Sequence, residues 1–122
     1  MIEYRIYKSV YDDMLSGKKN IEFRLLNEKS ERIKPGDKIK FKVLDNDNLY
    51  ILTNVVEKFV FNNIDELWEH KEILSNNILG YTKEELTSAF YNIFGKEKVI
   101  NSKIVGIKFN IIKWLNVMSM IK

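Results

Sequence analysis

Residues 17–24 carry a compact set of polar side chains that follows the pattern G-x-K-x-x-E-x-R. The pattern places Lys19, Glu22 and Arg24 in a stretch that alternates apolar and polar residues, which is typical of a strand. Because side chains two apart on a strand point to the same face, Glu22 and Arg24 lie together. Arg24 offers a planar donor fork for a phosphate or a guanine edge, and Glu22 can hold Arg24 or Lys19 in place or accept from a base amino group. The alternative is an ordinary solvated Glu–Arg pair, which contributes about 0–1 kcal/mol to stability.

Basic residues near and beyond this segment extend the candidate site. Lys18 adjoins Lys19, and Lys38, Lys40 and Lys42 form a row on one face of a predicted strand. A bound anion would relieve the repulsion along this row, and we select Lys40 as the candidate contact. Lysines also protect exposed sheet edges from pairing with another strand, and the row fits that role equally well.

Aromatic side chains are candidate stacking platforms for bases. Phe90 and Tyr91 are neighbours on a predicted helix, so one of them points away from the apolar stripe, and we select Tyr91. The remaining tyrosines and tryptophans are Tyr4, Tyr7, Tyr11, Tyr50, Tyr81, Trp68 and Trp114. Most aromatic side chains of a small domain belong to its core. His70, the single histidine, is expected on the surface of a helix.

The composition excludes several classes of site. The chain has 122 residues, enough for one ordinary domain, and contains no Cys and a single His. Disulfides, thiolate metal sites and a Cys nucleophile are therefore excluded, and neither a multi-His metal site nor a Ser-His-Asp triad is expected. We expect no metal and no cofactor. No stretch approaches the ~20 apolar residues of a membrane span, and the first residues lack the apolar run of a signal peptide, so we expect a cytoplasmic protein with no membrane partner.

The net charge of +3 is unevenly distributed along the chain. Residues 1–42 contain 11 Lys and Arg against 7 Asp and Glu, residues 43–95 contain 3 against 9, and residues 96–122 contain 6 against 1. Both ends of the chain are thus basic and the middle is acidic. If the ends meet in space, they form a positive face that attracts an anion such as nucleic acid. Lysines spread over solvated faces are the simpler alternative.

The apolar pattern predicts a strand, a helix, three strands, two helices and a final strand, in that order. Strands are predicted for residues 4–7, 20–25, 38–43, 49–61 and 103–112, and helices for residues 10–15, 63–68 and 82–94. Turn residues at 34–37 and 45–48 favour antiparallel neighbours. We therefore predict an α+β fold: a small mixed or antiparallel β-barrel with helices after the first strand and before the last.

Local signals sharpen or weaken individual elements of this prediction. Ser9 and Thr82 are expected helix caps, and Gly17 is an expected helix end. Residues 27–34 fit either a turn or a short helix, and residues 55–59 also fit a helical pattern.

Three blocks of sequence, in this order and spacing, resemble the ASCH domain (activating signal cointegrator homology). They are residues 17–24, residues 33–41 with the sequence IKPGDKIKF, and residues 90–91 followed by residues 104–109 with the sequence IVGIKF. The resemblance implies a PUA-like β-barrel of the small, single-domain prokaryotic type. We therefore predict an ASCH/PUA-like domain over residues 1–112 and a C-terminal apolar extension over residues 113–122.

The resemblance also implies binding of RNA or a nucleotide in a basic cleft beside the barrel, lined by the segment 17–24. The candidate RNA contacts are Lys18, Lys19, Glu22, Arg24, Lys40 and Tyr91. One branch of small bacterial members resembles amidohydrolases that deacetylate acetylcytidine, with a Lys of this motif as base and a Thr three residues on as nucleophile. Lys19 matches that Lys, whereas Glu22 stands at the Thr position, so the nucleophilic hydroxyl is missing here.

Two alternatives to an RNA-binding module stay open. As an enzyme acting on RNA or a modified nucleoside, an amidohydrolase or a ribonuclease, the chain would use Lys19 and Glu22 as catalytic residues. As a protein adaptor, it would use the apolar tail that begins at Trp114 for docking or self-association.

Overall fold

The computed structural model describes residues 1–70 and 82–115, with side chains for residues 1–70 and 82–112. The described elements, in chain order, are β1 (Ile2–Ile6), α1 (Lys8–Leu15), β2 (Ile21–Leu25), α2 (Glu28–Glu31), β3 (Lys38–Val43), β4 (Asn46–Phe61), α3 (Ile64–Glu69), α5 (Lys83–Phe94), α6 (Lys96–Ile100) and β5 (Ile104–Leu115). Among the described residues, no helix combines the length and the apolar character needed to cross a membrane.

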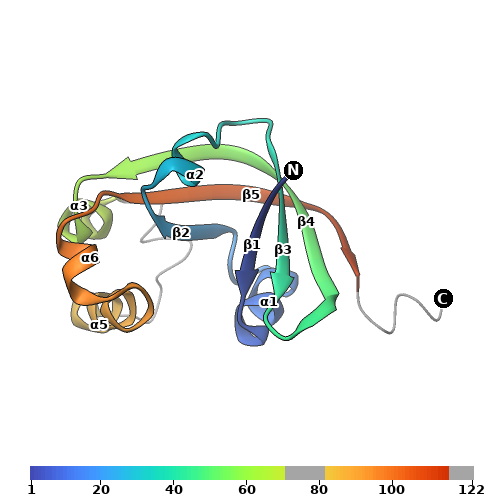
Figure 1. Ribbon diagram of the computed structural model, residues 1–122, viewed down its shortest axis with the longest axis horizontal. Coiled ribbons are helices and arrows are strands. Elements are labelled where there is room, and N and C mark those ends of the chain that lie inside the picture. The colour runs from blue at the N-terminus through green and yellow to red at the C-terminus, as the bar shows by residue number, and fades with distance from the viewer. Residues whose placement is uncertain (71–81, 116–122) are drawn as a thin grey trace.

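The strands form one mixed sheet in the order β1-β3-β4-β5-β2. β1 pairs with β3 in parallel, and the other neighbours are antiparallel. The long strands β4 and β5 arch across the molecule, and the sheet curls into a half-barrel, with α1 below β1 and β3 and with α3, α5 and α6 at the opposite end (Figure 1). The predicted α+β class and the small PUA-like barrel are confirmed, with one helix after the first strand and others before the last.

The alternating pattern of β3 sets its orientation in the sheet. Ile39, Phe41 and Val43 are buried, whereas Lys38 is exposed, as a half-buried strand requires. A tight turn joins β3 to β4, and its Asp45 has a φ of 67°, a left-handed conformation that Asp tolerates better than most residues.

Helix ends follow the capping signals in most places. Thr82 and Glu85 form a reciprocal capping box that begins α5, and Asn63 accepts from the Glu66 backbone N–H at the start of α3. The expected Ser9 cap is wrong, because α1 begins at Lys8, two residues earlier than predicted, and Tyr7 stands at its cap position with no side-chain cap bond.

Two hydrophobic cores lie at the two ends of the arch. The first packs α1 against β1, β3, β4 and β5 and is centred on Met14, Phe41 and Ile107. The second packs β2 and the neighbouring ends of β4 and β5 against α3, α5 and α6, with Leu67 and Phe90 among its members. The space between the two cores is where the site described below lies.

The C-terminal strand runs beyond the predicted domain core. β5 continues to Leu115, which pairs with Tyr50 of β4. The boundary at residue 112 stays a prediction. Residues 116–122 of the predicted extension 113–122 lie outside the described residues, as does Tyr81.

Candidate functional site

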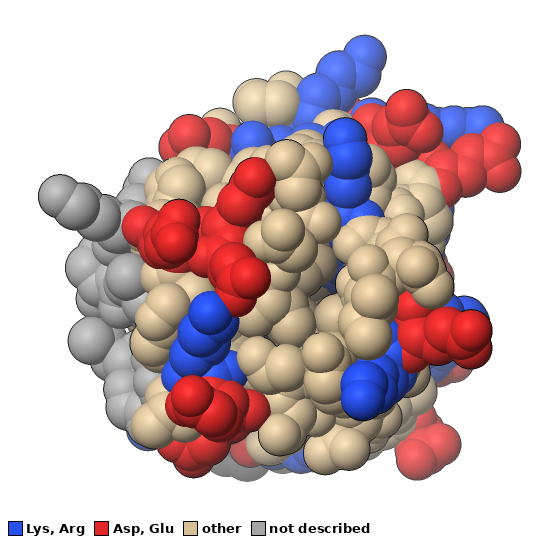
Figure 2. Space-filling view, turned by 90° about the vertical axis from the view of Figure 1, so that its left-hand side faces the viewer, with Lys and Arg blue, Asp and Glu red and all other residues tan. Residues whose placement is uncertain are grey.

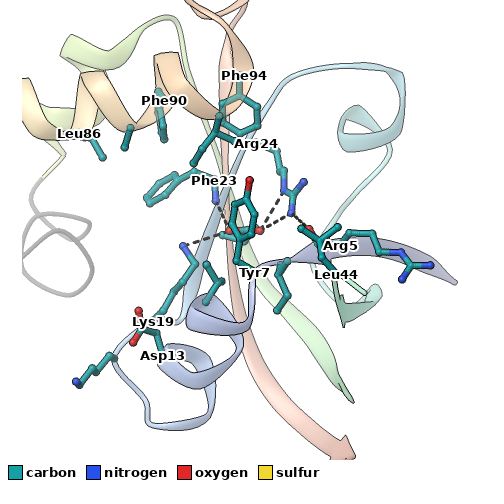
Figure 3. A pocket seen from close by; sticks show the side chains of 16 residues that line it. Arg5, Tyr7, Asp13, Lys19, Phe23, Arg24, Leu44, Leu86, Phe90 and Phe94 are labelled. Atoms are coloured by element: carbon teal, nitrogen blue, oxygen red, sulfur yellow. Dashed lines mark hydrogen bonds and ion pairs between the residues drawn. The ribbon is translucent and has the colours of Figure 1, made fainter. Parts of the chain in front are cut away.

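A cavity of about 470 Å³ opens between the two edge strands of the sheet. Its walls come from the end of β1, from α1, from β2 and from α5 (Figure 3). We call it the Lys19 cleft. Residues of both hydrophobic cores line it, Ile6 from the first and Phe90 from the second. The cleft therefore lies where the half-barrel is not closed by strand pairing between its described edges.

The turn after α1 aims the polar residues into this cleft. Gly17 follows the helix with a φ of 83°, a left-handed backbone conformation that glycine adopts more readily than any residue with a side chain. The Lys19 backbone N–H then donates to the Asp13 carbonyl at 3.1 Å, which fixes the chain as it enters β2. β2 pairs with β5, so Glu22 and Arg24 are held on a rigid strand.

Glu22 is the centre of the polar side of the cleft. Its side chain is only 8% exposed, yet its carboxylate has two cationic partners. Lys19 Nζ lies 3.3 Å from Oε1, and Arg24 donates to Oε2 through Nη2 at 2.8 Å and through Nε at 3.2 Å (Figure 3). Glu22 thus contacts both of the residues that it was predicted to hold in place, Lys19 and Arg24.

These partners keep the buried carboxylate ionised. Burial raises the pKa of Glu22, but the charges of Lys19 and Arg24 and their hydrogen bonds outweigh burial and leave the pKa below its ordinary value. With Glu22 ionised, the three side chains together carry one net positive charge. The polar side of the cleft thus presents the hydrogen-bond donors of Lys19 and Arg24, both held in place by the Glu22 carboxylate.

Arg24 also joins the two edges of the sheet. Its Nη2 donates to the backbone carbonyl of Arg5 on β1 at 3.0 Å, while its own strand lies at the other edge. The guanidinium carbon lies 4.4 Å from the centre of the Tyr4 ring, a cation–π contact. Arg24 is therefore fixed by an anion, a carbonyl and an aromatic face at once.

The remaining walls of the cleft are apolar and aromatic. Phe23 of β2 and Phe90 of α5 pack with ring centres 6.1 Å apart on one side. Tyr7 and Leu44 stand on the other side, and both are partly exposed, Tyr7 to 57% (Figure 3). An apolar slot with charged donors along one side fits a planar ring that carries polar edges, such as a nucleobase.

The structure brings together four of the six residues predicted to contact RNA. Lys18, Lys19, Glu22 and Arg24 all line the Lys19 cleft. Lys40 and Tyr91 are not among the described residues that line it. The Lys40 ammonium lies 4.4 Å from the Tyr50 ring centre on the sheet, while partly buried Tyr91 packs against the second core.

Four of the described aromatic residues line the cleft, and the sequence prediction selected none of them as a contact: Tyr7, Phe23, Phe90 and Phe94. Tyr7 is the most exposed of the four. It was one of several tyrosines, and nothing in its spacing marks it. Its place at the end of the first predicted strand was the only available signal, because strand ends often border clefts.

Charge is mixed on the end of the molecule formed by α3, α5 and α6. On this face, Lys and Arg side chains alternate with clusters of Asp and Glu around an uncharged centre (Figure 2). Lys83 pairs with Asp65 there. Within the described parts of the chain, no three His, Cys, Asp or Glu residues come together as a candidate metal site.

A curled half-barrel sheet with a ligand-sized cleft between its edges defines a small PUA-like domain. No family model and no curated protein matches the chain, but solved structures do. The hypothetical protein PH0355 superposes with a TM-score of 0.72 and 26% identity, over 90% of this chain and 97% of that one. PF0455 from Pyrococcus furiosus gives 0.67 and 29%, over 92% and 97%.

The fold is also that of solved ASCH domains. ASCH from Zymomonas mobilis superposes with a TM-score of 0.56 and 14% identity, over 97% of this chain and 74% of that chain. The resemblance found in the sequence is thus matched in three dimensions, and the chain is an ASCH-type domain in its fold.

Proposed function

We propose that the protein binds RNA or a nucleotide, with a base held in the Lys19 cleft. The observation that supports this most directly is the composition of the cleft, which combines aromatic walls with a net positive polar side. A base stacks between Tyr7 on one wall and Phe23 or Phe90 on the other. The free N–H groups of the Lys19 ammonium donate to its carbonyl or ring nitrogen acceptors.

The chemistry of Glu22 favours binding over catalysis. An acid catalyst must carry a proton, whereas the lowered pKa of Glu22 keeps it ionised at neutral pH. A lysine that acts as a general base must lack its extra proton, whereas Lys19 is paired with the Glu22 carboxylate at 3.3 Å. An amidohydrolase that uses Lys19 as its base would first have to break this ion pair.

The test is fluorescence anisotropy with short single-stranded RNA at ~50 and ~200 mM salt. In the native protein we expect affinity to fall as salt rises, because phosphate contacts release counterions. Lys19→Ala is expected to weaken binding, because it removes a donor to the base. Each sample is examined afterwards for cleaved RNA, since turnover that depends on Lys19 would instead favour the enzyme alternative.

The matched control is Lys34→Ala, which removes the same charge from an exposed site outside the cleft lining. It should leave affinity nearly unchanged. Because Lys19 also partners a buried carboxylate, Tyr7→Ala provides a second variant that removes an exposed ring and no ion pair. Equal binding by the native protein, Lys19→Ala and Tyr7→Ala would rule out the proposed site.

A further inference from the structure

A second cavity, of about 410 Å³, adjoins the Lys19 cleft on the far side of Arg24. We call it the Tyr4 cavity. Arg24, Ile93 and Phe94 line both cavities and so form the partition between them. Tyr4, Asn27, Lys98 and Ser102 belong to the Tyr4 cavity alone.

The two cavities differ in charge. The Lys19 cleft has carboxylates in its wall, Glu22 and Asp13. The described lining of the Tyr4 cavity contains two cations, Arg24 and Lys98, and no carboxylate. Asn27 and Ser102 add neutral hydrogen-bonding side chains. This set of groups suits an anion that takes several donors at once, as a phosphate does.

Tyr4 lines this cavity and carries a donor that the described residues leave unused. Tyr4 is 7% exposed, and its buried hydroxyl has no hydrogen-bond partner among the described residues. Burial raises the pKa of Tyr4, so the hydroxyl keeps its proton and can donate. A buried polar group without a partner is uncommon in a native protein and is often explained by a bound ligand or ion.

Two cations lie against the Tyr4 ring, and one of them, Lys29, is not part of the described cavity lining. Lys29 Nζ is 4.1 Å from the Tyr4 ring centre, and Arg24 Cζ is 4.4 Å from it. Burial and, after it, the nearby Arg24 charge lower the pKa of Lys29, while Glu3 opposes them. An anion in the cavity would add a favourable charge interaction with Arg24 and Lys29.

We propose that the Tyr4 cavity is a phosphate subsite next to the base-binding cleft, with Arg24 between the two. This proposal rests on the proposed function, because a ligand spans both cavities only if its base lies in the Lys19 cleft. The substrate class is accordingly a phosphorylated nucleotide or an RNA strand, and a free nucleoside fills only half of the site.

The first experiment uses inorganic phosphate as the probe, which needs no base site. Phosphate is titrated into ¹⁵N-labelled protein while amide shifts are followed by NMR. We expect saturable shifts at Asn27, Lys98 and Ser102, and a Kd raised about fivefold or more by Lys98→Gln. The matched control, Lys96→Gln, lies on the same helix outside the cavity lining and should leave the Kd unchanged. Shifts that do not saturate, or a Kd equal in Lys98→Gln and the native protein, would overturn the subsite.

Tyr4→Phe tests the hydroxyl separately. It removes a group that has no partner in the described structure, so we expect the melting temperature to stay the same or rise while the phosphate Kd increases. An unchanged Kd would remove Tyr4 from the subsite.

A comparison of a nucleoside with its monophosphate separates this inference from the proposed function. We expect the monophosphate to bind at least tenfold more tightly, with the gain lost in Lys98→Gln. Nucleoside binding that depends on Lys19 without any gain from the phosphate would overturn the subsite and leave the proposed function intact. Saturable phosphate binding that depends on Lys98 would support the subsite. If RNA binding were at the same time unaffected by Lys19→Ala and Tyr7→Ala, the proposed function would be overturned and the subsite would stand.

Discussion

Glu22→Gln is the substitution that tests the electrostatic account of the site most directly. The amide keeps the shape of the side chain but removes the charge that neutralises Lys19 and Arg24. It also places an N–H₂ group where a carboxylate oxygen now accepts from a cation. Both changes leave buried donors poorly paired, so the variant should be less stable than the native protein.

The size of the loss follows from the burial of the three side chains. Breaking a buried ion pair by removing one partner costs about 3–5 kcal/mol. Glu22 is nearly buried, but Lys19 and Arg24 are 22% and 23% exposed and keep part of their hydration. We therefore expect the lower end, about 3 kcal/mol of unfolding free energy at pH 7. Urea denaturation followed by circular dichroism measures this difference.

The pH dependence provides a second readout of the same substitution. The pKa of Glu22 is lower in the folded protein than in the unfolded chain. Its stabilising contribution is thus complete above the unfolded pKa, about 4.3, and is lost as the pH falls through the folded pKa. The stability gap between the native protein and Glu22→Gln should narrow in acid, because protonation makes the native side chain neutral as well. Other carboxylates titrate alike in both proteins and cancel in the difference.

Glu28→Gln is the matched control, since Glu28 also forms a Glu–Arg pair, with Arg32, but is 87% exposed. Its unfolding free energy should equal that of the native protein within experimental error. A Glu22→Gln protein as stable as the native one at pH 7 would refute the reasoning, and so would a gap that stays constant down to pH 3.

Three other outcomes follow from described contacts. Thr82→Ala removes the N-cap of α5 and should lower the unfolding free energy by about 1 kcal/mol, with Thr82→Ser restoring most of it in urea titrations. Thr53→Val should cost about 1–3 kcal/mol, because the fully buried Thr53 hydroxyl donates to the Ile39 carbonyl at 2.9 Å; an unchanged denaturation midpoint would contradict this. Lys40→Ala should leave RNA affinity close to the native value in anisotropy titrations, since Lys40 is outside the described lining of the Lys19 cleft. A loss of affinity as large as that of Lys19→Ala would instead show that Lys40 contacts the RNA.

The strands of the sheet were predictable because their signals are local. The alternation of residues 38–43 predicted which side chains of β3 are buried, and the spacing of Glu22 and Arg24 placed them on one face. In β2 the alternation did not predict burial, because Glu22 is buried by its contacts with Lys19 and Arg24 while Phe23 and Leu25 are only partly buried. The resemblance to ASCH domains supplied the barrel. The short helix α6 was missed because five residues directly after Gly95 are too few to show a helical period.

The composition of the cleft was less predictable because it depends on contacts between distant segments. The bond from Arg24 to the Arg5 carbonyl joins strands at opposite edges of the sheet, and no sequence pattern encodes it. The choice between Tyr7 and Tyr91 required knowing which face of α5 meets the sheet. Phe90 of α5 turned out to line the cleft, and its neighbour Tyr91 was directed elsewhere.

The long strands β4 and β5 have a consequence for how the protein unfolds. Ile51 and Val55 of β4 belong to the first core, and Phe61 of the same strand belongs to the second. β5 likewise contributes Ile104 to the second core and Phe109 to the first. Neither core can lose its packing without disturbing a strand that the other core needs. The two ends of the arch should therefore unfold in one cooperative transition, with the slowest amide hydrogen exchange along the β4–β5 ladder that joins them.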